Sequence, residues 1–136
     1  KISMKKKLLS ILLCLVMVVG LLPTAAFAAG SVDINEANFP DANFRSYVQT
    51  EFDKDGDKKL SSAEIAAVKE IIASLRGIKN LKGIEFFTAL ETLKCWDNEL
   101  TGLDLSKNTK LTSLSCSKNK LTALDVSKNT ELTRLY

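Results

Sequence analysis

The chain has 136 residues, of which 46% are hydrophobic, and this length has room for one modest domain. Because it contains no histidine, histidine-dependent triads, cysteine–histidine dyads and most zinc sites are excluded. The formal net charge is +3, but no long run of lysine and arginine is present, so nucleic acid is not an expected partner.

Residues 1–28 are predicted to be a cleaved secretory signal peptide. Three lysines, Lys5 to Lys7, precede an apolar run over residues 8–22 and an Ala-x-Ala site that ends at Ala28. A retained membrane anchor is the alternative, since the run approaches the roughly 18 to 20 residues that span a bilayer, but Pro23 and the cleavage site argue against it. We therefore expect a secreted, cell-surface protein with no stable membrane insertion after cleavage.

Cleavage at this site would change the charge balance of the chain. It would remove four of the 19 basic residues and none of the 16 acidic ones. The mature net charge would then be about −1, so the basic character belongs to the leader.

Residues 29–70 are predicted to form an EF-hand-like helix-loop-helix cap. Apolar residues recur at helical spacing after Pro40, which predicts a helix over residues 41–52. Ser61 and Glu64 have the spacing of a capping box, so a second helix is expected to begin at Ser62 and to run through Glu70.

The segment between these helices, DKDGDKKLSSAE, matches the spacing of a calcium-binding EF-hand loop. Its predicted ligands are the side chains of Asp53, Asp55 and Asp57, the carbonyl of Lys59, Ser61 directly or through water, and both oxygens of Glu64. Leu60 is expected to turn inward. With one such loop, a structural brace is favoured over a sensor, and an acidic turn that only caps a helix is the alternative.

Lys58 departs from the usual pattern of such loops. It stands at the sixth position, where glycine is usual because the backbone takes a positive φ. We expect weakened calcium affinity, with a dissociation constant of about 10⁻⁴ to 10⁻³ M.

Residues 71–136 repeat with an offset of 21, which predicts a leucine-rich-repeat solenoid and hence an α/β fold. The repeated positions include Leu90, Leu93, Cys95, Asn98, Leu100, Leu103, Leu105 and Asn108, each followed 21 residues later by a matching residue. Parallel strands are expected at residues 93–95 and 114–116, and the second half of each coil is expected to be extended or irregular. We expect the repeats to continue beyond Tyr136 in the whole protein.

Two residue types are predicted to point inward from successive coils. Asn98 and Asn119 are expected to form an asparagine ladder that satisfies backbone groups. Cys95 and Cys116 occupy one equivalent position, where free buried thiols are favoured; a disulfide between neighbouring parallel strands would need unfavourable geometry.

The repeat pattern also extends backwards toward the cap. Ile71, Ala73, Ile78, Leu81, Ile84, Phe87 and Leu90 continue the apolar spacing. The helix-loop-helix is therefore expected to cover the apolar end of the solenoid.

The segments INEANFPDANFRSYVQTEFDKDGD and IKNLKGIEFFTALETLKC resemble the N-termini of leucine-rich-repeat surface proteins of Gram-positive gut bacteria. GIKNLKGIEFFTALETL is also similar to the first coils of the internalin group, and the resemblance covers residues 32–136. It implies repeats that bind host proteins on a concave strand face, behind a helical cap with a calcium-loop-like element. The first family often carries anchors or catalytic modules downstream.

The leading functional hypothesis is a non-catalytic module that binds a protein or another cell-surface ligand. The residues expected on the exposed strand face are Thr92, Lys94, Trp96, Ser113, Ser115 and Ser117. Trp96 is the favoured contact, although packing against the cap or a neighbouring coil is an equal alternative. The other readings are a presentation region of a larger surface enzyme and a structural spacer.

Overall fold

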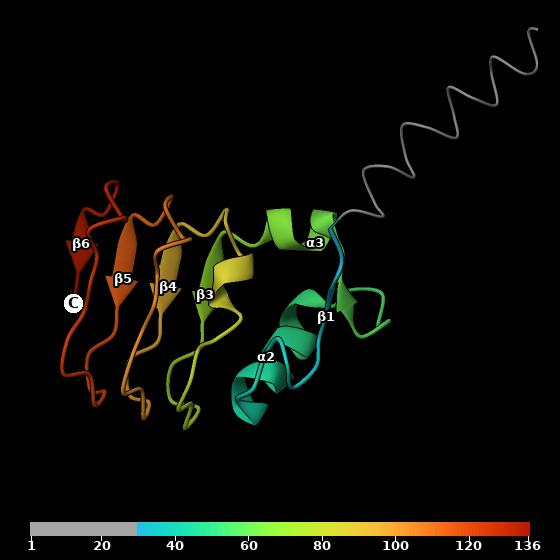
Figure 1. The fold of residues 1–136 in the computed structure, drawn as a ribbon, viewed down its shortest axis with the longest axis horizontal. Coiled ribbons are helices and arrows are strands. Elements are labelled where there is room, and N and C mark those ends of the chain that lie inside the picture. Colours follow the sequence, from blue (N-terminus) through green and yellow to red (C-terminus); the bar gives the residue numbers. More distant parts are fainter. Residues whose placement is uncertain (1–29) are drawn as a thin grey trace, which may run out of the picture. The chain divides into compact units, whose positions relative to one another are not determined.

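The computed structural model describes residues 30–136, so the predicted signal peptide lies outside the described residues. Val32–Tyr136 form one compact unit, in which a short antiparallel pair and two helices precede a four-stranded parallel sheet (Figure 1). Within residues 30–136, no helix has the length and apolar character needed to cross a membrane.

The helix-loop-helix is present near the start of this unit. Its elements are β1 (Val32–Asp33), α2 (Ala42–Phe52), β2 (Lys59–Leu60) and α3 (Ser62–Ala67). Asp41 caps α2, because its carboxylate accepts hydrogen bonds from the N–H groups of Asn43 and Phe44. The predicted capping box of Ser61 and Glu64 is confirmed at the start of α3.

The predicted end of the second helix is wrong. Instead of continuing to Glu70, α3 ends at Ala67, and Glu70–Ile72 form strand β3. Val68 and Ile71 are buried in the core, and β3 pairs with the next strand of the sheet. Helix over the three further residues 68–70 would have lost both that burial and that ladder, so tertiary pairing overrides a weak helical preference.

The parallel sheet follows chain order from β3 through β4 (Thr92–Lys94) and β5 (Ser113–Ser115) to β6 (Arg134–Leu135). Ile71, Leu93, Leu114 and Leu135 stand opposite one another across it. The spacing is thus 22 residues once and 21 twice, which confirms the period. The middle strands begin one residue earlier than predicted, and Cys95 and Cys116 directly follow them.

The core follows the predicted apolar pattern. The junction residues Ile71, Ala73, Ile78, Leu81, Ile84, Phe87 and Leu90 are all buried. The second half of each coil is irregular, as predicted, apart from a 3₁₀ turn, η1 (Ile84–Phe86), in the first. Cys95 and Cys116 are free thiols. Burial raises the pKa of Cys95 to about 12, so this thiol is unreactive near neutral pH.

The asparagine ladder is confirmed at Asn98. Its Oδ1 accepts hydrogen bonds from the N–H groups of Arg76 and Ile78, both at 3.0 Å. Its Nδ2 donates to the carbonyls of Ala73 and Cys95 at 2.8 and 3.0 Å. Each rung therefore joins its own coil to the preceding one.

A second asparagine ladder, absent from the sequence interpretation, runs along the irregular half of the coils. The Nδ2 of Asn108 donates to the carbonyls of Ile84 and Phe87. Asn129 repeats the arrangement with the carbonyls of Leu105 and Asn108. Both asparagines are buried, so each coil is joined to its neighbour at two separate points.

The first coil departs from both ladders where it meets the cap. Arg76 and Phe87 stand at the two asparagine positions, and both contact residues of the cap instead. The Arg76 guanidinium lies 4.5 Å from the centre of the Tyr47 ring, and the Phe87 ring packs against Phe39 and Phe52. The cap therefore takes the place that a preceding coil would occupy against the first coil.

Two polar side chains of the cap complete this junction. The second carboxylate oxygen of Asp41 accepts hydrogen bonds from the N–H groups of Lys79 and Asn80, at 2.8 and 3.2 Å. The hydroxyl of Tyr47 accepts a hydrogen bond from the N–H of Ile72 at 2.9 Å. Because β3 is the edge of the parallel sheet, Tyr47 blocks an N–H that would otherwise be open to strand addition.

Replacing Tyr47 by phenylalanine is expected to cost about 1 to 2 kcal/mol of stability at pH 8, because the Ile72 N–H loses its acceptor. Burial raises the pKa of Tyr47 above its usual value near 10, although the Ile72 N–H lowers it. A raised folded-state pKa contributes stability below pH 10 that is lost as the pH rises further. Denaturant titrations from pH 8 to 11 should therefore show the gap between wild type and variant narrowing; a constant gap would contradict this.

Candidate functional site

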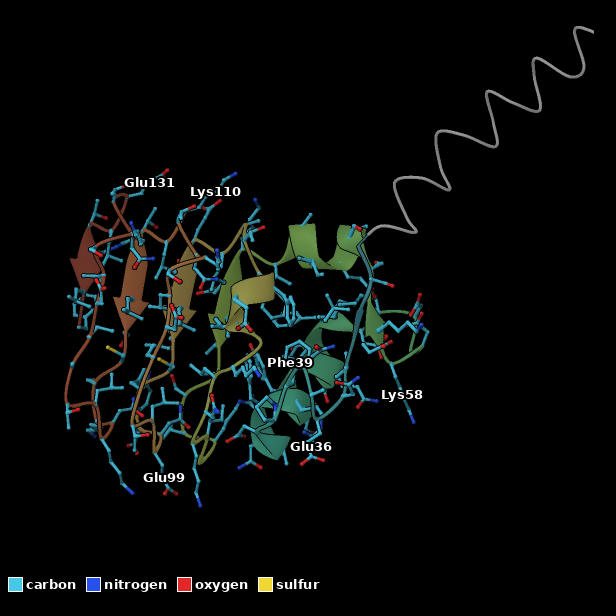
Figure 2. All side chains as sticks on the ribbon, viewed as in Figure 1. Glu36, Phe39, Lys58, Glu99, Lys110 and Glu131 are labelled. Atoms are coloured by element: carbon cyan, nitrogen blue, oxygen red, sulfur yellow. The ribbon has the colours of Figure 1, made fainter. Side chains whose placement is uncertain are left out.

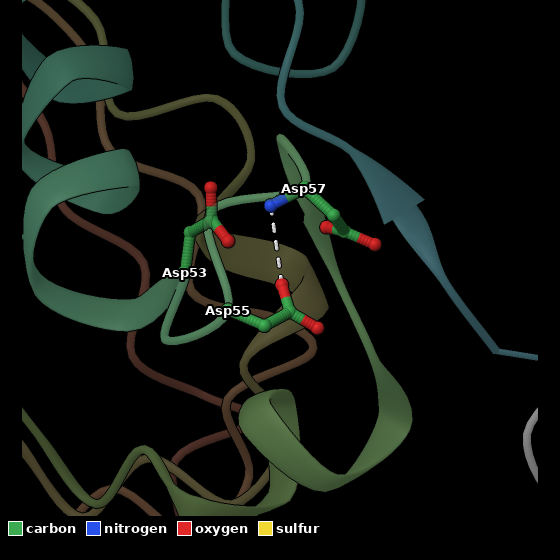
Figure 3. A group of neighbouring side chains, drawn as sticks. All are labelled: Asp53, Asp55 and Asp57. Atoms are coloured by element: carbon green, nitrogen blue, oxygen red, sulfur yellow. Dashed lines mark hydrogen bonds between the residues drawn. The ribbon is translucent and has the colours of Figure 1, made fainter.

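The acidic loop brings three carboxylates together. Asp53, Asp55 and Asp57 each place a carboxylate oxygen within 4.8 Å of the others (Figure 3). The loop's own N–H groups hold them: those of Gly56 and Lys58 donate to Asp53, that of Asp57 to Asp55, and that of Lys59 to Asp57. The remaining lone pairs of these carboxylates are available to a cation.

The pairing of β1 with β2 fixes the direction of the Lys59 carbonyl. Val32 stands opposite Leu60 and Asp33 opposite Lys59, while the Ile34 N–H donates to the carbonyl of Lys58. In an antiparallel pair, alternate residues direct their backbone groups away from the partner strand. The Lys59 N–H points into the loop, so its carbonyl points to the same side. Leu60 is fully buried, as predicted.

Glu64 closes the loop from the first turn of α3. One of its carboxylate oxygens accepts from the Lys54 N–H at 2.7 Å, and the other accepts from the N–H and hydroxyl of Ser61, both at 2.8 Å. Partial burial raises the pKa of Glu64, but these hydrogen bonds outweigh it and hold the pKa below its usual range. Glu64 is therefore ionised and oriented across the loop, with Ser61 as its immediate partner.

Mutual repulsion is also visible in the loop. The Asp57 N–H lowers the pKa of Asp55, but desolvation and the charges of Asp57, Glu64 and Asp53 together raise it. Three aspartates thus converge, and the charge of Glu64 is near enough to act on Asp55; this arrangement suits a hard divalent cation with oxygen ligands.

Lys58 adopts the predicted left-handed conformation, with φ of 62°. Gly56, two residues earlier, has φ of 76° and supplies the other sharp turn of the loop. In Figure 2 the Lys58 side chain extends outward from the loop, away from the repeats. Its charge therefore faces solvent, and its cost to the loop is chiefly one of backbone conformation.

The predicted strand-face residues lie in two rows across the sheet. Thr92 stands opposite Ser113 and Lys94 opposite Ser115. Trp96 and Ser117 are the second residues after the two strands, and there the Asp97 N–H donates to the carbonyl of Ser117. The structure thus brings together all six predicted residues, and Ser117 is the exposed member while the others are half-buried.

Sequence reasoning missed two members of this face, Glu70 and Ile72, because it assigned Glu70 to a helix. Glu70 stands opposite Thr92 and Ile72 opposite Lys94, and the Lys94 ammonium lies 2.9 Å from a Glu70 carboxylate oxygen. A signal was present, since Ile71 and Ala73 precede Leu93 and Cys95 by 22 residues each.

Comparison with known proteins supports the leucine-rich-repeat architecture. No family model matches the chain. Internalin J of Listeria monocytogenes is 42% identical over 71 residues, which are 52% of this chain and 8% of that protein. The solved functional domain of internalin J from Listeria monocytogenes, described as including a cysteine ladder, is 39% identical with a TM-score of 0.69. That match covers 77% of this chain and 23% of the other.

Two further solved internalins of Listeria monocytogenes have the same fold. One, inlF, is 27% identical with a TM-score of 0.68, over 74% of this chain and 31% of its own. The other, internalin C2, is 25% identical with a TM-score of 0.70, over 79% of this chain and 48% of its own. The chain thus spans less than half the length of each of these proteins, and its fold is that of an internalin-like leucine-rich-repeat protein.

Proposed function

We propose that this chain is the N-terminal, non-catalytic part of an exported bacterial surface protein, and that its repeats bind a partner protein on the strand face. The observation that carries the proposal is that Thr92 with Ser113, and Lys94 with Ser115, form two polar rows across neighbouring strands, each partly open to solvent. The likeness to internalins supports this reading, since the resemblance implies host-protein binding by the concave strand face.

Within this proposal, the acidic loop holds one calcium ion that braces the cap. The ligands would be the carboxylates of Asp53, Asp55, Asp57 and Glu64 and the carbonyl of Lys59, with Ser61 near the site. Calcium would supply the positive charge that offsets the three converging aspartates and the neighbouring Glu64. The loop joins α2 to α3, so a brace here would stiffen the surface that covers the first coil.

Calcium at 10 mM is expected to stabilise the chain by about 1.4 kcal/mol if the dissociation constant is about 1 mM. The melting temperature should then rise by about 4 °C or more relative to the chain in chelator. Glu64→Gln should abolish both the calorimetric binding signal and the calcium-dependent rise. Asp104→Asn, an acid in the second half of a coil, is the matched control and should retain both. Absence of binding at 10 mM calcium would reduce the loop to an acidic turn.

Protein binding by the strand face is tested with labelled chain on host cells before and after protease treatment of the cells. The double variant Ser113→Arg, Ser115→Glu should lower binding at least tenfold, because it places two large charges in β5, one of the two inner strands of the face. The control is Thr109→Arg, Thr130→Arg, at exposed positions in the irregular half of the coils. Binding that survives protease, or that falls equally in both variants, would contradict the proposal.

A further inference from the structure

The turn at Leu75 in the first coil has a left-handed backbone conformation, and burial of the side chain does not offset its cost. Leu75, Asp97 and Lys118 stand at the same turn in successive coils, with φ of 60°, 55° and 52°. Aspartate enters this left-handed region readily, whereas leucine has no polar group to bond locally. The Leu75 side chain is 64% exposed, so burial does not offset the strain. The conformation belongs to the repeat, since Lys118 shares it; what distinguishes Leu75 is an exposed apolar side chain at that turn.

Two exposed large apolar side chains, Leu75 and Ile72, lie in the first coil at the cap end of the sheet. Ile72, on the exposed face of β3, is 48% exposed. The N–H of Leu75 donates to the carbonyl of Trp96 at 3.2 Å, which brings the turn beside the half-buried Trp96 of the next coil. We call Ile72, Leu75 and Trp96 the cap-end patch.

The patch is not a feature of the repeat itself. The residues opposite Ile72 in the next coils are Lys94 and Ser115, and those equivalent to Leu75 are Asp97 and Lys118. The residue equivalent to Trp96 in the following coil is Ser117. Apolar side chains therefore appear on this face in the first coils, where polar ones would satisfy the fold equally well.

Beside Leu75 lies a polar hollow of about 330 Å³ between α2 and the strained turn. Its lining includes the hydroxyls of Ser46 and Thr50, the guanidinium of Arg76 and one carboxylate, Glu51. Arg76 is exposed and forms no ion pair within residues 30–136, where its described contact is the Tyr47 ring. The hollow thus offers several donors and one unpaired cation next to apolar surface.

We propose that the cap-end patch and the hollow together anchor an extended segment of the partner protein, which places an apolar side chain on Ile72, Leu75 and Trp96 and a neighbouring carboxylate at Arg76. This inference rests on the proposed function and names the chemistry of the partner. Charge complementarity to Arg76 selects an acidic rather than a basic neighbour. The cap is then part of the binding surface, as well as a cover for the core.

The test is a selection of a displayed random-peptide library on the full chain, followed by affinity measurements on the recovered peptides. These peptides should carry an aromatic or large aliphatic residue beside Asp or Glu. Leu75→Asn should weaken their binding at least tenfold while raising the melting temperature by about 4 °C, because asparagine tolerates the left-handed turn. Lys118→Asn, at the same turn two coils further on, is the control and should leave binding unchanged. Arg76→Gln should weaken only those peptides that carry the acid.

Each other outcome overturns the inference in a distinct way. A fall in melting temperature for Leu75→Asn would make Leu75 a structural residue. If peptide binding is unchanged by Leu75→Asn but abolished by Ser113→Arg, Ser115→Glu, the proposed function stands and this anchor is ruled out. Recovery of no peptide by either surface would remove both proposals. A concentration-dependent dimer that Leu75→Asn abolishes would make a second copy of the chain the occupant.

Discussion

Replacing Gly83 by alanine is expected to lower the free energy of unfolding by about 3 kcal/mol or more, the sum of overpacking and a left-handed backbone. A Cβ at this position would lie 2.2 and 2.5 Å from two carbons of the Phe39 ring and 2.9 Å from the carbonyl oxygen of Asn38. The φ of Gly83 is 105°, a conformation that side chains rarely adopt. Two separate costs therefore act at one residue.

The Phe39 ring cannot move aside to relieve this clash. It is fully buried, and its centroid lies 6.0 Å from that of Phe44, 5.8 Å from that of Phe86 and 6.5 Å from that of Phe87. In Figure 2, Phe39 lies between α2 and the repeats. A displaced Phe39 would open a cavity between cap and first coil, so the damage should extend to the cap as a whole.

Gly102→Ala is the matched control, because a Cβ there would meet nothing within 4 Å. Denaturant titrations of both variants should show a large loss of stability for Gly83→Ala and a change within about 0.5 kcal/mol for Gly102→Ala. Equal effects in the two variants would mean that the Phe39–Gly83 contact does not hold the cap in place.

Much of the fold follows from local spacing. The 21-residue period predicted the parallel strands, the inward leucines and the first asparagine ladder, because each rung repeats one sequence pattern. The spacing of the acidic loop predicted that Asp53, Asp55 and Asp57 lie close together, since a short loop determines its own geometry. Glu64, the fourth predicted carboxylate, is not in that group, and the calcium site stays a prediction. Both predictions depend on residues that are near one another in sequence or related by the repeat.

The predictions failed where the cap meets the first coil. Residues 68–70 were predicted as the end of a helix because they follow a capping box, whereas this segment leads into β3, which pairs with β4 more than 20 residues later. The second bond of Asp41, to the N–H groups of Lys79 and Asn80, also joins residues almost 40 positions apart. The positive φ at Leu75 was not predicted either, because leucine gives no local sign of a left-handed turn. Long-range pairing decides all three, and local propensity does not encode it.

Replacing Asn98 by alanine is expected to cost about 3 kcal/mol, because the buried Ile78 N–H and Ala73 carbonyl and the part-buried Arg76 N–H lose their partner together. The Cys95 carbonyl keeps a second donor, the Asn119 amide. The N–H groups of Arg76 and Ile78 would lose an acceptor, and the carbonyls of Ala73 and Cys95 would lose a donor. The side chain is 8% exposed, so water reaches these groups poorly. The first and second coils should separate more readily, which denaturant titration and faster alkylation of the Cys95 thiol would both report.

Asn119→Ala removes the equivalent asparagine one coil later. Comparing the two variants shows whether the loss of stability depends on how deeply the asparagine is buried. Asn119 is half-buried, so water can replace part of what it bonds, and its loss should cost about half as much. Asn98→Asp keeps the acceptor for the two N–H groups but faces a carboxylate toward two carbonyls, so it should be no more stable than Asn98→Ala. If Asn98→Asp retained wild-type stability, the two carbonyls would not depend on the amide, and the ladder would act through its acceptor side alone.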